Sequence, residues 1–192
     1  MNFSKRTLDC LSDVLLIEPR RFVDSRGHFF EAWSQSAFAA LGLELDFVQD
    51  NVSLSTFSGT LRGLHFQTPP HEQAKLVTVV RGAVYDVVVD VRPNSPTRGQ
   101  WAGVSLTADK GEMLFVPRGF AHGFVTLVDE TVVSYKVDAP YAVDCEAGIR
   151  WNDPTLNISW PIKTNVTLSD KDACLPLYDE PLNARSAHRA MG

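Results

Sequence analysis

The sequence is short of the features that mark several common classes of protein. Its three cysteines, Cys10, Cys145 and Cys174, are odd in number and widely spaced, which does not suit a disulfide framework. No uninterrupted apolar run approaches the roughly 18 residues that a membrane-spanning helix needs. The first ten residues carry two cations with no apolar stretch after them, so we expect no secretory signal peptide. These absences predict a cytoplasmic protein with reduced thiols and no membrane partner.

The sequence also lacks an excess of basic residues. Its 18 Lys and Arg against 23 Asp and Glu give a formal net charge of −5. A nucleic-acid-binding protein needs a basic surface that neutralises phosphates, so we expect no nucleic-acid partner, although a local cation cluster can still bind a small anion. The length of 192 residues and a hydrophobic content of 44% predict one globular domain over 1–180. The small and polar residues of 181–192 predict a flexible C-terminal tail.

Helix signals are few, and most of the sequence has the pattern of short strands. One short helix is expected from Ser34, a typical N-cap residue, to Gly42, a typical helix stop. Short runs rich in β-branched residues, separated by glycine and proline turns, predict an all-β sandwich or jelly-roll barrel. Leu76–Val80 and Ala83–Val91 flank Arg81-Gly82 and are expected to form a hairpin. The other expected strands are 61–67, 100–106, 113–116, 123–127 and 131–137.

The segments 59–67 and 73–77 carry three side chains suited to proton chemistry. They contain a cation, Arg62, a titratable imidazole, His65, and an amine, Lys75. A base with two positive charges nearby can remove a proton from a carbon next to a carbonyl group and stabilise the resulting enolate. Strict strand alternation places Arg62 and His65 on opposite faces, so a shared site requires a bulge, for which Gly63 is suited. The alternative, that His65 is a hydrogen-bonded core histidine, stays open.

The segment Gly111–His122 has the order glycine, five residues, proline, one residue, glycine, two residues, histidine. This order is the second sequence signature of cupin barrels, and it supports the β prediction. In metal-binding cupins this histidine is a ligand, and a His-x-His pair supplies two more. The corresponding place here reads His65-Phe66-Gln67, without the second histidine. A divalent metal held by His65, His122 and Glu72 stays open as an alternative.

Tyr135 and Asp172 each allow more than one interpretation. Tyr135 is either a cross-strand aromatic or a phenol that returns a proton from the face opposite a base. Asp172 ends the stretch 168–172, which has the pattern of a capped helix start or of a charged turn. It is also one of many candidates for the acidic partner that a histidine base needs.

Blocks spread over about nine tenths of the chain follow one another in the order found in one enzyme family. They are 24–27, 29–31, 49–51, 59–67, 73–77, 89–92, 95–97, 115–124, 135–136, 148–154 and 168–172. Through these blocks the sequence resembles the dTDP-4-dehydrorhamnose 3,5-epimerase family of the cupin superfamily. The resemblance implies an all-β, cupin-type jelly-roll barrel with a few short helices.

The resemblance also implies a reaction and a role for each matching residue. The reaction inverts C3 and C5 of dTDP-4-dehydro-6-deoxy-D-glucose through C4 enolates, in dTDP-L-rhamnose biosynthesis. His65 matches the general base, Asp172 its carboxylate partner, Tyr135 the general acid on the opposite sugar face, and Lys75 the residue that stabilises the enolate oxygen. The matching substrate-binding positions are Arg26, Phe29, Glu31, Gln49, Asn51, Arg62, His122, Tyr141, Glu146 and Lys171, with Tyr141 stacking on thymine.

The resemblance further implies which partners accompany the enzyme. It implies a dTDP-sugar substrate, no metal or other cofactor, and a homodimer in which N-terminal strands of one subunit complete the site of the other. Relatives with the same histidine, aspartate and tyrosine invert only C3 or only C5, so a single-carbon epimerase stays open. A metal-dependent cupin oxygenase or isomerase and a non-catalytic sugar-nucleotide-binding module are the remaining alternatives.

Overall fold

The computed structural model describes residues 2–162 and 164–178. The expected tail at 181–192 lies outside these residues, and a single domain over 1–180 stays a prediction. Within the described ranges, no helix is both long and apolar enough to cross a membrane.

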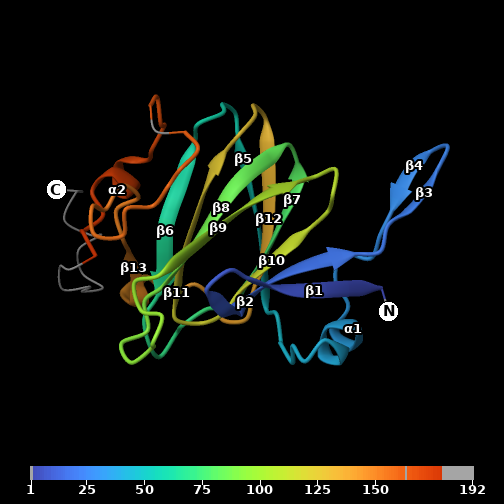
Figure 1. Ribbon diagram of the computed structural model, residues 1–192, viewed down its shortest axis with the longest axis horizontal. Coiled ribbons are helices and arrows are strands. Elements are labelled where there is room, and N and C mark those ends of the chain that lie inside the picture. The colour runs from blue at the N-terminus through green and yellow to red at the C-terminus, as the bar shows by residue number, and fades with distance from the viewer. Residues whose placement is uncertain (1, 163, 179–192) are drawn as a thin grey trace.

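Two antiparallel sheets face each other and form the body of the protein (Figure 1). The six-stranded sheet has the order β1 (Phe3–Leu8), β2 (Leu11–Pro19), β10 (Met113–Val116), β7 (Lys75–Arg81), β12 (Thr131–Val137) and β5 (Gln49–Ser55). The five-stranded sheet has the order β13 (Glu146–Gly148), β6 (Leu61–Gln67), β11 (Phe120–Thr126), β8 (Ala83–Asp90) and β9 (Trp101–Thr107).

The remaining elements are short. The strands β3 (Phe22–Asp24) and β4 (Gly27–Phe29) form a hairpin that projects away from the two sheets (Figure 1). Helix α1 (Gln35–Ala40) follows it, the 3₁₀ helix η1 (Val143–Cys145) precedes β13, and helix α2 (Asp170–Ala173) lies beyond β13 in the chain. The predicted all-β fold with a few short helices is confirmed. The predicted helix is also confirmed, because α1 begins after the N-cap residue Ser34.

The predicted hairpin between 76–80 and 83–91 is wrong. The strands β7 and β8 belong to different sheets, and Gly82, with a φ of +84°, turns the chain from one sheet to the other. Val77 of β7 and Val84 of β8 both belong to the buried cluster between the sheets. An alternating pattern therefore fits two strands that face each other as well as two strands that pair, and the sequence could not separate these arrangements.

Three apolar clusters hold the sheets in place. The first fills the space between them. The second, with Trp160 and Leu156, covers the outer face of the five-stranded sheet, and the third packs Phe38 of α1 against the six-stranded sheet. Because the five-stranded sheet is covered on both faces, the Val87–Val89 run of β8 is fully buried.

The bulge expected at Gly63 is confirmed. His65 of β6 lies opposite His122 of β11, and Arg62 lies opposite Phe124, so three steps along β6 match two along β11. Gly63 has a φ of +120°, and a Cβ there would lie 2.6 Å from the Gly123 Cα. Only glycine fits this close approach, and the extra residue turns Arg62 and His65 toward the same cavity.

Candidate active site

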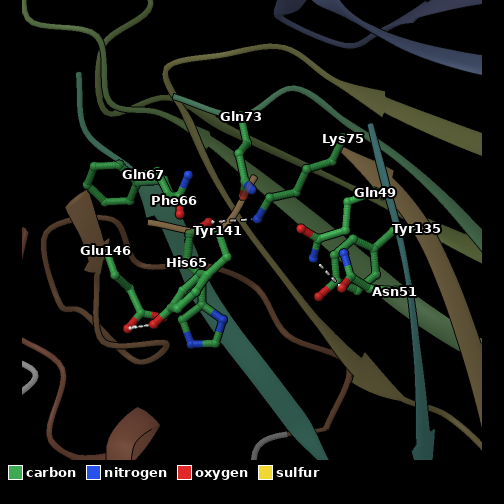
Figure 2. A pocket seen from close by; sticks show the side chains of 10 residues that line it. All are labelled: Gln49, Asn51, His65, Phe66, Gln67, Gln73, Lys75, Tyr135, Tyr141 and Glu146. Atoms are coloured by element: carbon green, nitrogen blue, oxygen red, sulfur yellow. Dashed lines mark hydrogen bonds between the residues drawn. The ribbon is translucent and has the colours of Figure 1, made fainter. Parts of the chain in front are cut away.

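Two cavities, with volumes of about 330 Å³ and 230 Å³, share His65, Lys75 and Tyr135 in their walls. We call them together the pocket. These three residues come from β6, β7 and β12, and therefore from both sheets. The close view in Figure 2 shows their side chains around one opening, with the Lys75 side chain reaching across from the six-stranded sheet. The structure therefore brings together the three residues to which the family resemblance gives the roles of base, enolate-stabilising cation and acid.

His65 is paired with Asp172, which α2 supplies. His65 Nε2 lies 2.5 Å from Asp172 Oδ1, and the Gly63 N–H donates to Oδ2 at 3.5 Å. Ser169 caps α2 by accepting the Asp172 N–H at 3.1 Å, which confirms the capped-helix interpretation of 168–172. Burial acts to raise the pKa of Asp172, but hydrogen bonds from His65, Gly63 and Ser169 outweigh it and lower the pKa. An ionised carboxylate only accepts, so it holds the proton on Nε2 and leaves the Nδ1 lone pair as the base.

Lys75 places its amine in the interior of the pocket. Its Nζ donates to the His65 carbonyl oxygen at 3.3 Å, and the residue is buried. Burial lowers the pKa of Lys75 to about 8, against the opposing charges of Asp86 and Glu146. A poorly hydrated ammonium interacts strongly with a negative oxygen that develops beside it, because no water competes for the charge.

Tyr135 stands on the wall formed by the six-stranded sheet. It lies opposite Asn51 in the β12–β5 ladder, and Gln49 donates to Asn51 Oδ1 at 2.8 Å beside it (Figure 2). Burial raises the pKa of Tyr135, with a smaller opposing effect from the Arg62 charge. The phenol therefore keeps its proton at neutral pH and can donate it from the wall opposite β6.

Arg62 and His122 add polar groups to the same pocket. The Arg62 guanidinium is held by Ser55 Oγ at 3.2 Å and by the Leu54 carbonyl oxygen at 3.1 Å. His122 Nε2 lies 2.8 Å from Asp86 Oδ1, within the barrel. Both side chains are thus fixed before any ligand arrives.

The outer rim of the pocket carries an acid, a base and an aromatic ring in contact. The Tyr141 hydroxyl donates to Glu146 Oε2 at 3.0 Å, and Lys171 pairs with the other oxygen of Glu146. The ring of Tyr141 is exposed at the rim, so a flat base can stack on it.

Three predicted substrate-binding residues do not lie at the pocket of their own chain. Arg26 and Phe29 belong to the β3–β4 hairpin, where Arg26 pairs with Asp24 at 2.6 Å and Phe29 is 70% exposed. They line a separate hollow on the hairpin. Glu31 accepts a hydrogen bond from the Asn2 amide at 2.7 Å.

Several residues that line or support the pocket were not predicted from the sequence. Gln67 accepts the Ala142 N–H and Gln73 donates to the Ala139 carbonyl oxygen, both at 2.7 Å, so they hold the loop that presents Tyr141. Alternation could have indicated Gln67, two residues after His65. The other lining residues that were missed are Ser53, Phe66, Phe124 and Ser169.

The metal set considered from the sequence does not form. His65 and His122 each direct Nε2 to a carboxylate. In residues 2–162 and 164–178, no three or more His, Cys, Asp or Glu side chains are grouped so that they could hold a metal ion.

Residues 9–180 match the sequence profile of a family described as dTDP-4-dehydrorhamnose 3,5-epimerase. The chain belongs to this family. A Shigella flexneri protein named dTDP-4-dehydrorhamnose 3,5-epimerase is 50% identical over 163 residues, which cover 84% of this chain and 89% of that protein.

Solved structures of such epimerases have the same fold. The Bacillus anthracis dTDP-4-dehydrorhamnose 3,5-epimerase, determined with TDP and PPi bound, is 50% identical with a TM-score of 0.88, covering 91% of this chain and 99% of that one. The Legionella pneumophila dTDP-6-deoxy-D-glucose-3,5-epimerase, in complex with dTDP-4-keto-L-rhamnose, is 40% identical with the same TM-score of 0.88 and covers 93% and 94%. The predicted cupin-type jelly roll is therefore confirmed.

Proposed function

We propose that this epimerase-family protein inverts C3 and C5 of dTDP-4-dehydro-6-deoxy-D-glucose and gives dTDP-4-dehydro-L-rhamnose, for L-rhamnose biosynthesis. The observation that carries the proposal is the convergence of His65, Lys75 and Tyr135 on one pocket. A base and an acid on facing walls, with a cation between them, match a reaction that removes a proton from one ring face and adds one to the other.

His65 begins the reaction. The keto group at C4 makes the hydrogens on C3 and C5 acidic, and Nδ1 takes one of these protons. The electrons of the C–H bond form a C=C bond to C4, and the keto oxygen becomes an enolate oxygen. Asp172, already bonded to Nε2, stabilises the imidazolium that forms.

Lys75 and Tyr135 complete the cycle. The Lys75 ammonium stabilises the enolate oxygen, as an oxyanion donor worth about 3 kcal/mol does. Tyr135 then donates its phenolic proton to the same carbon from the opposite face, and the keto group re-forms. After proton exchange with solvent, the steps repeat at the second carbon. The net reaction transfers only protons, so it needs no redox cofactor, and Lys75 supplies the positive charge that stabilises the enolate oxygen.

The other polar residues of the pocket bind the nucleotide sugar. We assign Arg62, His122, Gln49 and Asn51 to the sugar and diphosphate, because they lie beside the reacting groups. We assign the rim residues Tyr141, Glu146 and Lys171 to the thymidine end. We also place the protein in the cytoplasm, since Cys10, Cys145 and Cys174 are free thiols.

The reaction is tested by hydrogen exchange. Incubation with dTDP-4-keto-6-deoxyglucose in heavy water should place deuterium at both C3 and C5, as followed by proton NMR. Deuterium at one carbon only would select a single-carbon epimerase. Exchange at neither carbon would reject the enzyme and leave a binding module.

We further propose a homodimer in which the β3–β4 hairpin of each subunit closes the pocket of the other. Two observations support it. The hairpin with Arg26 and Phe29 projects from its own chain (Figure 1). The outer face of edge strand β5 exposes Val52 and Leu54. Uncovered apolar sheet faces of this kind are typical of subunit interfaces.

The homodimer is tested by mixing two defective variants. Arg26→Ala damages the donated hairpin and His65→Ala damages the pocket. After exchange of subunits, a mixed dimer has one intact pocket closed by one intact hairpin, so activity should exceed that of either variant alone. A mixture no more active than its components would contradict the exchange.

A further inference from the structure

Asp86 is a buried carboxylate for which the chemistry above gives no role. It lies in the middle of β8 with 0% of its side chain exposed, between apolar neighbours on a central strand. Val84 and Val88, on the same face of β8, belong to the core between the sheets. A carboxylate in such a place costs stability unless it is well paired, so its presence needs a reason.

The pairing of Asp86 is incomplete. Its Oδ1 bonds His122 Nε2 at 2.8 Å, but Oδ2 is buried and has no hydrogen-bond partner among the described residues. Asp90 lies on the same strand and is equally buried, but both of its carboxylate oxygens accept hydrogen bonds. The donors are Arg92, Ser95 and Thr97. Asp90 thus has the bonding of a structural residue, whereas Asp86 has a single hydrogen bond and one unbonded oxygen.

The charge of Asp86 acts on Lys75. Burial lowers the pKa of Lys75 to about 8, and among the opposing influences Asp86 comes first and Glu146 second. Without Asp86, the Lys75 amine would lose its proton at a lower pH. The other titratable or charged groups that share the pocket walls with Lys75 are Arg62, His65, His122, Tyr135, Tyr141, Lys171 and Asp172.

Asp86 also fixes the ring of His122. An ionised carboxylate accepts the Nε2–H, which leaves Nδ1 as the nitrogen available to a ligand in the pocket. The same residue therefore acts on two neighbours of the enolate oxygen, one through charge and one through a hydrogen bond.

We propose that Asp86 is a positioning residue of the epimerase reaction, whose Oδ1 orients His122 toward the sugar and whose buried negative charge acts on the cation Lys75. The proposal rests on the function proposed above and adds a residue to it. It explains why a carboxylate with one unused oxygen occupies the core beside the reacting groups.

Asp86→Asn tests the proposal, because the amide has the shape of the carboxylate without its charge. In the wild-type protein kcat should fall as the pH rises through about 8, where Lys75 loses its proton. In Asp86→Asn this alkaline fall should move down by about one pH unit, since an opposing charge has been removed. At pH 7 kcat should fall roughly twofold, because about half of the Lys75 amines then keep the proton, while KM changes little.

Two further variants make the test specific. Asp86→Ser keeps an oxygen for His122 Nε2 but removes the charge, so it should move the alkaline fall in the same way. Asp90→Asn removes an equally buried carboxylate of β8 that is bonded elsewhere, and it should keep the wild-type pH profile. If one Asp86 variant does not fold, as judged by circular dichroism, the other carries the test.

Two outcomes would overturn the inference: an unmoved alkaline fall in a folded Asp86 variant, or an equal displacement in Asp90→Asn. Deuterium exchange in the wild-type protein tests the reaction itself, so a failure of the proposed function is distinguished from a failure of the role given to Asp86.

Discussion

The pocket contains two histidine–carboxylate pairs that lie on neighbouring strands and differ in access to solvent. The His65 side chain is 32% exposed and its partner Asp172 comes from α2, whereas the His122 side chain is 8% exposed and its partner Asp86 comes from the adjacent strand β8. A base must release its proton to solvent between turnovers, which the more exposed pair, His65–Asp172, permits; we call it the open pair. The buried pair, His122–Asp86, is suited to holding its charge and its orientation constant. In the proposed mechanism, therefore, burial rather than residue type separates the roles of the two histidines.

The largest expected effect separates the two histidines directly. His65→Ala removes the base, so kcat should fall roughly 10³-fold while the affinity for dTDP stays nearly unchanged. His122→Ala removes a group that orients the sugar, so kcat should fall by closer to tenfold. Steady-state kinetics and calorimetric titration with dTDP measure both. Equal losses would remove the distinction, and an unfolded His65→Ala protein would show that His65 is a core histidine instead.

The second effect concerns Lys75, the buried cation of the pocket. Lys75→Met should lower kcat roughly 10²-fold, because the enolate oxygen loses its counter-charge. The same substitution should have the opposite effect on stability, which it should increase. The pKa of Lys75 is about 8 in the folded protein against 10.5 when unperturbed, so at pH 7 both states are charged and the full cost of burial is present.

The cost at Lys75 is relieved only as the pH rises from about 8 to 10.5, where the unfolded chain binds more protons than the folded one. At pH 7 the Met variant should therefore be more stable, by on the order of 2 kcal/mol. Urea denaturation at pH 7 and pH 10 measures this, and the advantage should shrink at the higher pH. A variant that is less stable at both values would contradict the origin given for the pKa shift.

The smallest effect tests how the open pair is held. Ser169→Ala removes the cap that positions Asp172, which should cost about 1 kcal/mol of stability and reduce kcat a few-fold. Ser34→Ala is a matched control. Ser34 caps α1 in the same way, by accepting the Ala37 N–H, but it does not line the pocket. It should lower stability similarly with no change in kcat. A loss of activity shared by both variants would show only general destabilisation.

Local patterns predicted much of the fold and part of the site. The bounds of β12 and the cap of α1 follow from local propensity and turn residues, and the bulge at Gly63 follows from the requirement that Arg62 and His65 share a site. The assignment of β7 and β8 to different sheets did not follow, because it depends on contacts across the core.

Two further features depend on parts of the molecule that local patterns do not describe. Arg26, Phe29 and Glu31 lie away from the pocket of their own chain, and only the homodimer proposed above would bring them to a pocket. The pairing of His65 with Asp172 joins residues 107 positions apart, so resemblance to the family indicated it and spacing could not. Asp86 did leave a signal, because it is one of two charged residues, with Asp90, within the otherwise apolar run 83–91, and charges are rare in a central strand unless they are paired.

The most direct test of the facing base and acid is deuterium exchange in Tyr135→Phe. Without the phenol, His65 can still remove a proton from C3 or C5 and return a deuteron to the same face. The account predicts that this variant, in heavy water, exchanges hydrogen at these carbons while forming at most about one hundredth of the inverted product. Inversion at the wild-type rate, or loss of exchange together with inversion, would contradict it.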